Sequence, residues 1–208
     1  MKFLDKILNK PKQPSFQEIQ DAVRKKYAEV SRSAEGKFKY PTGKEGTLKL
    51  GYDVSVIDEM SDDLVSSFCG VGNPFTLGPL NEGEAVLDIG CGAGFDLIIA
   101  GRAVSEKGKV CGIDITPEMA EKARKNLGKA GITNSDIRVA GAEAIPFNDH
   151  TFDVITSNGV LNLSPLKEKS FSEIYRVLKP GGRLQFADIV LKEDLPDKVA
   201  GSLDAWSD

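Results

Sequence analysis

The feature that most constrains the fold is a glycine-rich loop between an apolar run and a helical pattern. Residues 85–90, AVLDIG, are nearly all apolar, which predicts a strand buried on both faces. The loop DIGCGAG occupies residues 88–94, and helical periodicity follows over 94–104. Glycines at such a junction let the backbone turn sharply and approach a ligand without a Cβ in the way. This pattern predicts a ligand site at the carboxyl end of a parallel sheet.

Strand and helix patterns alternate after this loop. Apolar runs predict further strands over residues 109–114, 136–140, 152–158 and 183–190. Helical patterns are predicted over residues 117–130 and 165–178. Units of this kind form right-handed crossovers, so the strands run parallel and helices cover both faces. The sequence therefore predicts an α/β fold with a Rossmann-like, doubly wound, mostly parallel sheet.

The residues before the sheet predict a helical extension. Residues 1–14 end in PKQP, which breaks any helix and predicts a flexible tether. Ser15 and Glu18 form an S-x-x-E capping box, so an amphipathic helix is expected to begin there. Residues 31–50 show little periodicity and predict a long loop. We expect the helix and residues 31–60 to cover the ligand site as a lid.

Composition excludes several classes of protein. Lys and Arg number 27 and Asp and Glu 31, and this net charge of −4 argues against nucleic-acid binding by bulk positive charge. No apolar stretch approaches the length of a membrane span. Cys69, Cys91 and Cys111 are too scattered for a disulfide framework or a metal site. We expect a cytoplasmic protein with reduced thiols and no metal, nucleic-acid or membrane partner.

A carboxylate, Asp114, ends the second predicted strand, twenty residues beyond Gly94. A carboxylate in this place can accept hydrogen bonds from both hydroxyls of a ribose. The alternative is that Asp114 caps the following helix, a role that Thr116 fills better. Asp88 is likewise either a ligand-binding acid or a buried brace of the loop. We favour ligand binding for both, because the two acids occur in register with the glycines.

The spacing of the glycines separates two classes of cofactor. A dinucleotide-binding loop follows G-x-G-x-x-G, which would put its third glycine at position 95. That position is Phe95, and the third glycine is Gly94, so the loop is G-x-G-x-G. A nicotinamide-dependent oxidoreductase is therefore the less favoured alternative.

Residues 84–190 resemble the class I S-adenosylmethionine-dependent methyltransferases. The motifs that carry the resemblance are LDIGCGAG (87–94), GID (112–114), GAEAIPF (141–147), FDVITSN (152–158) and RVLKPGGRL (176–184). The resemblance implies S-adenosylmethionine as the cofactor and methyl transfer as the reaction.

The resemblance also assigns a place along the cofactor to each matched position. Gly90–Gly92 would lie against the methionine moiety, and Asp114 would hold the ribose. Many family members carry an acid at the position of Gly141 that accepts from the adenine amino group, and this chain lacks it. Ile115, Ala142 and Glu143 would lie at the adenine, and Asn158 beside the amino-acid end. The full implied set is Asp88, Gly90, Cys91, Gly92, Gly94, Asp114, Ile115, Ala142, Glu143 and Asn158.

A narrower resemblance lies outside these motifs. The segments LGYDVSVIDEM…FCGVGNP (50–74) and SNGVLNLSPLKEK (157–169) are similar to the arsenite methyltransferase family. That family binds trivalent arsenic through cysteine thiolates, and two of its cysteines align with Val71 and Gly159. Both thiols are absent here, so we expect a different small-molecule acceptor. The candidate substrate-contacting residues are Cys69 and Asn162.

The predicted function is therefore a small-molecule methyltransferase, related to the arsenite enzymes but with an altered acceptor. The second hypothesis is a cofactor-binding or scaffold protein without catalysis, which the missing thiols favour. No catalytic acid or base is assigned, because the single histidine, His150, lies in a polar turn.

The expected domain organisation has three parts. A flexible tether spans 1–14, a helical or lid segment spans 15–80, and the S-adenosylmethionine-binding domain spans 81–208. Only eighteen residues follow residue 190, fewer than the closing helix and hairpin of this class require. We therefore expect the C-terminal strands of the sheet to be missing.

Overall fold

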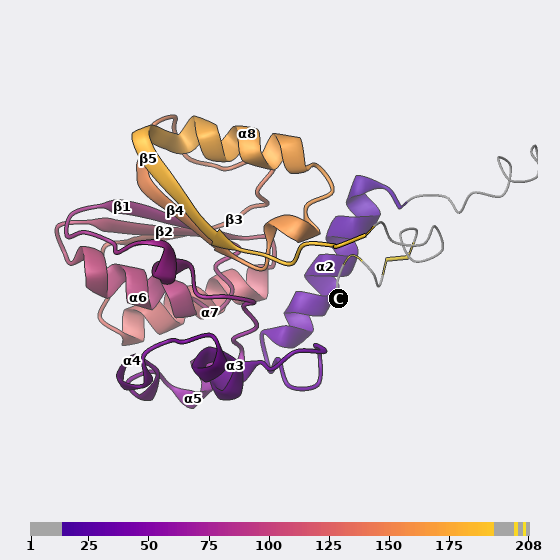
Figure 1. Cartoon of the computed structure of the whole chain (residues 1–208), viewed down its shortest axis with the longest axis horizontal. Helices are drawn as coiled ribbons and strands as arrows, with labels where there is room; N and C mark the ends of the chain where they lie inside the picture. Colours follow the sequence, from indigo (N-terminus) through magenta and orange to yellow (C-terminus); the bar gives the residue numbers. More distant parts are fainter. Residues whose placement is uncertain (1–13, 194–201, 204–205, 207–208) are drawn as a thin grey trace, which may run out of the picture.

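The chain is built around a sheet of five parallel strands. The computed structural model describes residues 14–193, 202–203 and 206. The strands are β1 (Ala85–Ile89), β2 (Lys109–Asp114), β3 (Ser135–Val139), β4 (Phe152–Asn158) and β5 (Leu178–Ala187). Their spatial order is β3-β2-β1-β4-β5, so the winding reverses between β1 and β4 (Figure 1). This confirms the predicted doubly wound parallel sheet, whose ligands bind at such a reversal.

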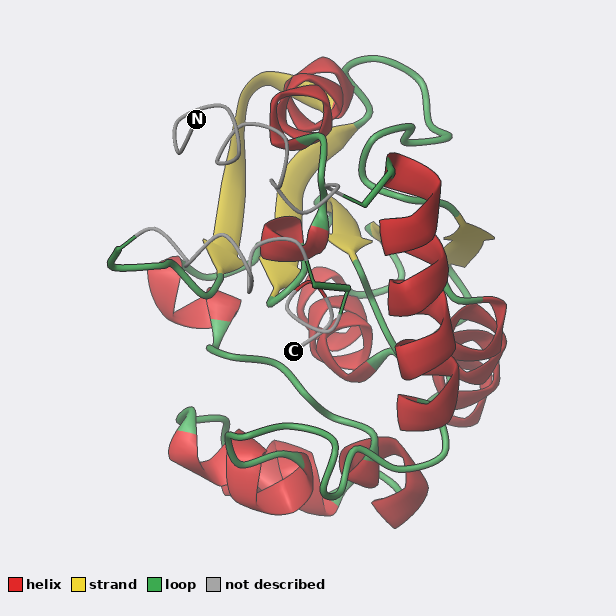
Figure 2. Cartoon of the chain, turned by 90° about the vertical axis from the view of Figure 1, so that its right-hand side faces the viewer, coloured by secondary structure: helices red, strands yellow, loops and turns green. Residues whose placement is uncertain are grey.

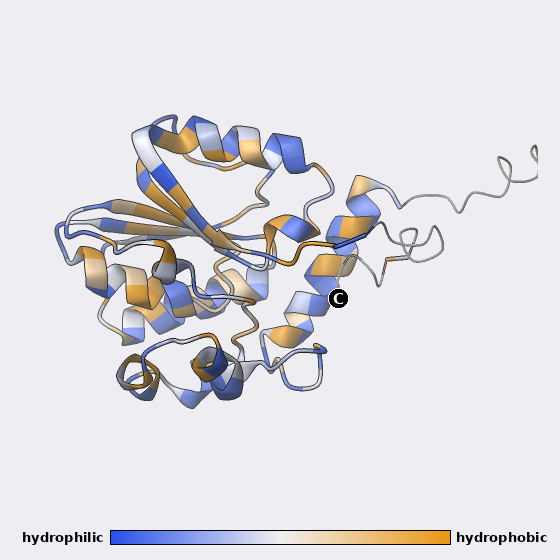
Figure 3. Cartoon of the chain, in the orientation of Figure 1, coloured by the Kyte–Doolittle hydropathy of each residue, from blue (hydrophilic) through white to orange (hydrophobic). Residues whose placement is uncertain are grey.

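Helices cover both faces of the sheet. The helices α6 (Phe95–Val104) and α7 (Pro117–Lys129) pack on one face, and α8 (Lys167–Val177) packs on the other (Figure 1). Each face of the sheet has its own apolar core, and Figure 3 shows the helices with alternating apolar and polar stretches. No helix in the described part of the chain is long and apolar enough to cross a lipid bilayer.

The residues before the sheet form short helices. These are α2 (Phe16–Val30), α3 (Gly43–Lys49), α4 (Val54–Asp58), α5 (Asp62–Ser66) and the 3-10 turn η1 (Pro74–Leu77). The predicted capping box of α2 is present, because Ser15 Oγ accepts from the Glu18 N–H and Glu18 Oε2 accepts from the Ser15 N–H at 2.7 Å. Figure 2 shows α2 standing across the ends of the strands. The predicted tether falls outside the described residues, apart from Pro14.

The predicted loop over 31–50 holds for residues 31–42 but was wrong for residues 43–49, which form α3. Two glycines, Gly43 and Gly46, give this segment a low intrinsic helix propensity. A Cβ on Gly46 would lie 2.6 Å from the carbonyl oxygen of Pro41, so the glycine permits a close backbone contact. Packing of α3 against α5 therefore overrides local propensity.

The strand β5 differs from its predicted range of 183–190. It spans Leu178–Ala187, and residues 179–182 bulge out of the ladder before regular pairing with β4 begins. The strand ends early because the side chain of Asp188 accepts from the backbone N–H of Asn162 at 2.9 Å. This contact draws the chain towards η2 (Leu161–Leu163) instead of extending the sheet.

Lys122 links two of the N-terminal helices to the sheet domain. Lys122 Nζ of α7 donates to the carbonyl oxygens of Ser31 at 2.8 Å and of Asp63 at 3.0 Å, and to Asp63 Oδ1 at 2.9 Å. Its side chain is only 14% exposed. The end of α2 and the start of α5 are thus held by one cation that is largely removed from water.

We expect Lys122→Met to loosen this junction. The variant keeps the apolar stem but removes three charge-assisted hydrogen bonds, so the free energy of unfolding should fall by about 1–3 kcal/mol. Denaturant unfolding would measure the change. The matched control is Lys125→Met on the same helix, whose exposed ion pair with Glu121 spans 3.5 Å and is worth at most about 1 kcal/mol. Equal losses in the two variants would contradict the assigned role.

Candidate functional site

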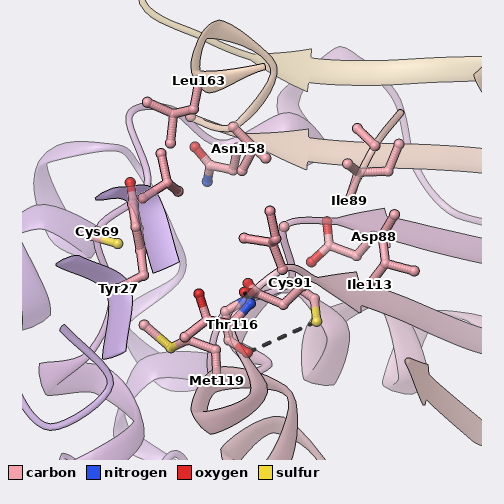
Figure 4. A pocket seen from close by; sticks show the side chains of 18 of the residues that line it. Tyr27, Cys69, Asp88, Ile89, Cys91, Ile113, Thr116, Met119, Asn158 and Leu163 are labelled. Carbon is pink, nitrogen blue, oxygen red and sulfur yellow. Dashed lines mark hydrogen bonds between the residues drawn. The ribbon is translucent and has the colours of Figure 1, made fainter. Parts of the chain in front are cut away.

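A pocket opens at the carboxyl ends of β1, β2 and β4, where the winding of the sheet reverses. Figure 4 shows side chains from the sheet on one side of it and Tyr27, Cys69 and Leu163 on the other. The predicted residues that line it are Cys69, Asp88, Gly90, Cys91, Gly92, Asp114, Ile115, Ala142, Glu143 and Asn158. Gly94 and Asn162 are not among the lining residues. Gly94 begins α6 against Ala123, and Asn162 lies in η2.

The glycine loop adopts a backbone that side chains would disfavour. Gly90, Gly92 and Gly94 have φ angles of +70°, +51° and +92°. A Cβ on Gly90 would lie 2.3 Å from Val160 Cγ2, so a side chain there would collide. A Cβ on Gly92 would meet nothing within 4 Å, so this backbone faces open space in the pocket. The loop can therefore bring its backbone close to a ligand.

The carboxylate of Asp114 ties the loop to the end of β2. Its Oδ2 accepts from the Gly92 N–H at 2.9 Å, and its Oδ1 accepts from the Thr116 N–H at 2.8 Å. Burial raises the pKa of Asp114 to about 6. Thr116 is the N-cap residue of α7, as expected, although its side chain makes no capping hydrogen bond. Asp114 thus braces the loop while it lines the pocket.

Two further carboxylates are buried behind the loop. Asp88 Oδ1 accepts from Thr156 Oγ1 at 2.7 Å, and burial with the nearby Asp96 carboxylate raises the pKa of Asp88. Asp96, in the first turn of α6, accepts from the Tyr52 hydroxyl at 2.8 Å, and burial raises its pKa to about 6. Such groups favour a positively charged ligand, because a nearby cation stabilises the ionised carboxylate.

Asn158 forms hydrogen bonds with several segments around the site. Its Oδ1 accepts from the N–H groups of Val71 at 2.8 Å and Gly72 at 3.1 Å. Its Nδ2 donates to Asp96 Oδ2 and to the Tyr52 hydroxyl, both at 3.1 Å. The end of β4 therefore holds the turn over residues 70–73 against α6. The amide fills its hydrogen-bonding capacity within the protein, although it also lines the pocket.

The side of the pocket opposite the loop is formed by α2 and the residues after α5. Tyr27 lines the pocket and also contacts Phe38, with ring centroids 6.2 Å apart, so it both packs and covers the site. Burial raises the pKa of the Tyr27 hydroxyl, and burial also raises the pKa of the Cys69 thiol to about 12. Both groups are therefore neutral at physiological pH. Residues 31–60, expected in the lid, do not line the pocket, whereas residues 64–70 contribute to its wall.

Two positions of the arsenite methyltransferase resemblance meet beside the pocket. A Cβ built on Gly159 would lie 3.2 Å from Val71 Cγ1, so the two positions that align with cysteines of that family are neighbours in space. Cys91 and Cys111 are free and buried, and Cys91 also lines the pocket. No group of three or more His, Cys, Asp or Glu side chains within residues 14–193 is arranged to hold a metal ion.

Several lining residues were not predicted from the sequence. They include Gln20 and Val23 of α2, Asp96 of α6, Thr116 and Met119 at the start of α7, and Leu163 of η2. Asp96 could have been found, because an acid two residues after the last glycine of the loop must lie in the first turn of a buried helix. The others carry no local signal, since only the tertiary fold brings α2 and η2 over the sheet.

Comparison with known proteins identifies the family of the sheet domain. The Methyltransferase domain family matches residues 80–207. An arsenite methyltransferase of Halobacterium salinarum is 36% identical over 197 residues, which cover 88% of this chain and 50% of that protein. A ubiquinone/menaquinone biosynthesis C-methyltransferase of Escherichia fergusonii is 40% identical over 62% of this chain and 51% of its own length. The chain thus spans about half the length of these curated relatives.

Solved structures agree with this placement. A methyltransferase dependent on S-adenosylmethionine from Aquifex aeolicus has a TM-score of 0.52 and 32% identity, over 61% of this chain and 70% of that one. An arsenic(III) S-adenosylmethionine methyltransferase from Chlamydomonas reinhardtii has a TM-score of 0.58 and 33% identity, over 77% and 53% of the two chains. The chain therefore belongs to the S-adenosylmethionine-dependent methyltransferases, and S-adenosylmethionine is its cofactor.

Proposed function

We propose that this chain binds S-adenosylmethionine in the pocket at the strand ends and transfers its methyl group to a small-molecule acceptor. The observation that carries the proposal is the bond between Asp114 and the Gly92 N–H. It brings an open, side-chain-free backbone next to a buried carboxylate at the reversal point of the sheet. An adenosyl ligand with a positively charged end needs that combination.

The residues present suit the parts of this cofactor. The open backbone at Gly92 leaves room for the methionine moiety, with Gly90 and Cys91 on the same bend. Asp114 still has free lone pairs for ribose hydroxyls, because each of its oxygens accepts only one bond. Ile115, Ala142 and Glu143 supply an apolar wall and a polar edge for the adenine. We assign Asp88, Gly94 and Asn158 to holding this cradle in shape.

Acidic side chains line the pocket, and basic side chains are absent from its described lining. Asp88, Asp96, Asp114 and Glu143 line it, and none of its described lining residues is Lys, Arg or His. When bound, the cofactor supplies an electrophilic methyl group on a positively charged sulfonium. The acids favour that charge and disfavour an anionic acceptor beside it. The proposed acceptor is accordingly a neutral small molecule.

The residues at the proposed acceptor end of the pocket differ from those expected of an arsenite-binding site. The contact between Val71 and Gly159 replaces two thiols, and Cys69 alone cannot form a multidentate soft-ligand site. The lining also offers a protonated Tyr27 hydroxyl and no free base at this end. The acceptor is therefore a nucleophile that needs little help from a base, such as a sulfur or selenium compound. Asn162 does not line the pocket, so we assign it no direct contact with the acceptor; its neighbour Leu163 in η2 lines the pocket instead.

The N-terminal residues complete the proposal. We assign α2 the role of a cover over the cofactor, since Gln20, Val23 and Tyr27 line the pocket. The domain boundary near residue 80 then separates this cover from the cofactor-binding sheet. Three free cysteines support a reducing compartment such as the cytoplasm. The alternative is a scaffold that binds the cofactor without turnover. It is supported by the absence of cysteines at positions 71 and 159.

We expect Asp114→Ala to weaken binding of S-adenosylhomocysteine at least about tenfold. The substitution removes hydrogen bonds to the ribose and releases the loop at Gly92, and a bond to a charged group contributes about 1.5–3 kcal/mol. Titration calorimetry would measure the affinity, and Asp114→Asn keeps the shape if the alanine variant unfolds. The matched control is Asp136→Asn on β3, outside the pocket. An unchanged affinity in both Asp114 variants would contradict the proposed site.

The affinity for S-adenosylmethionine should depend on pH near 6. Burial raises the pKa values of Asp96 and Asp114 to about 6, so both are ionised at pH 8 and largely protonated at pH 5. A cationic ligand prefers the ionised form, so lowering the pH from 8 to 5 should weaken binding about tenfold. S-adenosylhomocysteine lacks the sulfonium charge and should lose less affinity. Asp114→Asn should flatten the profile, and identical profiles for both ligands would count against charge recognition.

The acceptor itself can be tested with methyl-labelled S-adenosylmethionine. Label should pass to a small thiol or selenol, which gives up its proton to solvent, and not to arsenite, because the family's two aligned cysteine positions hold Val71 and Gly159. Mass spectrometry of the products would measure both transfers, with a Tyr27→Phe variant as a check on the hydroxyl. Transfer to arsenite at the rate seen with the thiol would contradict the altered acceptor. Cofactor binding without transfer to any acceptor would favour the scaffold.

A further inference from the structure

A second cavity lies between the N-terminal helices and the helices that cover the sheet. Its volume is about 580 Å³, which is enough for a small molecule. Residues from the turn between α4 and α5, from α6 and from the end of α7 line it. Figure 1 shows α4 and α5 on the side of α6 and α7 that faces away from the sheet. None of the residues expected to bind the cofactor lines this cavity.

Helical spacing gives the cavity an apolar floor and a charged rim. Ile98 and Arg102 lie four residues apart on α6 and so share one face of that helix. Asn126 and Lys129 lie three residues apart on α7 and are likewise neighbours. Leu64 and Ile98 are each 2% exposed, whereas Arg102 and Lys129 are exposed. A ligand here can bury an apolar part and keep its charged groups at the rim.

The rim carries a positive charge that the protein leaves without a partner. Arg102 Nη1 lies 2.9 Å from Glu59 Oε2, so these two charges balance one another. Lys129 makes no ion pair and no side-chain hydrogen bond with any residue that the structure describes. A carboxylate on the ligand would complement this ammonium group.

Asn126 adds an unpaired acceptor to the floor. Its Nδ2 donates to the carbonyl oxygen of Ala93 in the glycine loop at 2.9 Å, which fixes the orientation of the amide. Asn126 is only 4% exposed, and its Oδ1 accepts no hydrogen bond from residues 14–193. That oxygen is nevertheless not fully buried. Because Asn126 lines this cavity and not the cofactor pocket, the acceptor is available to a ligand here.

An α-amino acid with an apolar side chain complements all three features. Its carboxylate meets Lys129, its ammonium donates to Asn126 Oδ1, and its side chain lies over Leu64 and Ile98. The two charged groups sit on one carbon, which suits two protein groups one helical turn apart. An anion without a donor would leave the Asn126 oxygen unpaired, and an amine without a carboxylate would leave Lys129 unpaired.

Two contacts connect this cavity with the cofactor pocket. Leu64 lines both of them, and Ala93, whose carbonyl oxygen Asn126 holds, lines the cofactor pocket. A donor on Asn126 Oδ1 would keep the amide in the orientation that binds the glycine loop, and linked hydrogen bonds polarise one another. A ligand in the second cavity therefore favours the present position of the loop.

We propose that this cavity is a regulatory site, which binds a free α-amino acid with an apolar side chain and thereby strengthens cofactor binding. The site lies outside the machinery of methyl transfer. Only its effect on the cofactor rests on the proposed function. Since coupling between two sites is reciprocal, the cofactor also tightens binding of the amino acid.

The site itself can be tested without any cofactor, by titration calorimetry of the whole chain with L-leucine. Isoamylamine lacks the carboxylate, isocaproate lacks the ammonium and glycine lacks the apolar side chain. Each should bind at least about tenfold more weakly than L-leucine. Lys129→Met should weaken L-leucine about tenfold and leave isoamylamine unchanged. The matched control is Lys125→Met on the same helix, which does not line the cavity and should bind L-leucine normally.

The coupling is measured by titrating S-adenosylhomocysteine with and without saturating L-leucine. The amino acid should tighten S-adenosylhomocysteine binding at least about fivefold, and Lys129→Met should remove most of this gain. Weaker binding of S-adenosylhomocysteine would mean that L-leucine competes for the cofactor pocket, which would overturn the proposal. Melting temperatures would check that each variant folds.

The remaining outcomes separate this inference from the proposed function. If L-leucine does not bind, or if Lys129→Met binds it as tightly as the unmodified chain, the second site is overturned. If L-leucine binds but S-adenosylhomocysteine affinity stays the same, the regulatory role is overturned. If L-leucine binds as described and S-adenosylhomocysteine does not bind at all, the amino-acid site stands and the proposed function fails.

Discussion

The structure depends on the hydrogen bond that a buried carboxylate at the end of β2 accepts from the glycine loop after β1. Without it, the Gly92 N–H would face the pocket unpaired and the loop would have no fixed position against the sheet. The loop can take this position because its glycines tolerate positive φ and because Val160 fills the space beside Gly90. The same carboxylate then borders the pocket. Fold and recognition therefore share one side chain, Asp114.

This arrangement places several carboxylates close together in a buried environment that holds little water. Asp88 and Asp96 lie behind the loop, and burial raises both of their pKa values. Buried acids of this kind lower stability unless they are hydrogen-bonded, and here Thr156, Tyr52 and Asn158 supply the bonds. A sulfonium ligand would relieve the remaining cost. The free protein thus gives up some stability at neutral pH for a pocket that already favours its cofactor.

Much of the sheet could be predicted from the sequence, because its signals are local. The apolar runs, the capping box at Ser15 and the glycine loop each lie within a few residues, and all three elements form as predicted. The helix α3 could not be predicted, since its stability comes from packing across the chain. The pocket-facing roles of Gln20 and Leu163 also depend on contacts between distant segments. Asn158 lines the pocket where the motif predicts it, and its hydrogen bonds also hold the turn over residues 70–73.

The departures from the arsenite enzymes share one physical logic. Val71 lies in the turn that Asn158 holds, and it packs against Gly159 just after β4. Thiols at these two positions would face one another, whereas an apolar contact closes the space instead. Elsewhere in the pocket, the Glu143 carboxylate, which accepts from Ser164 Oγ, lies in the space beside Gly141. The two positions thus show the same effect, because a neighbouring side chain occupies the space beside each glycine.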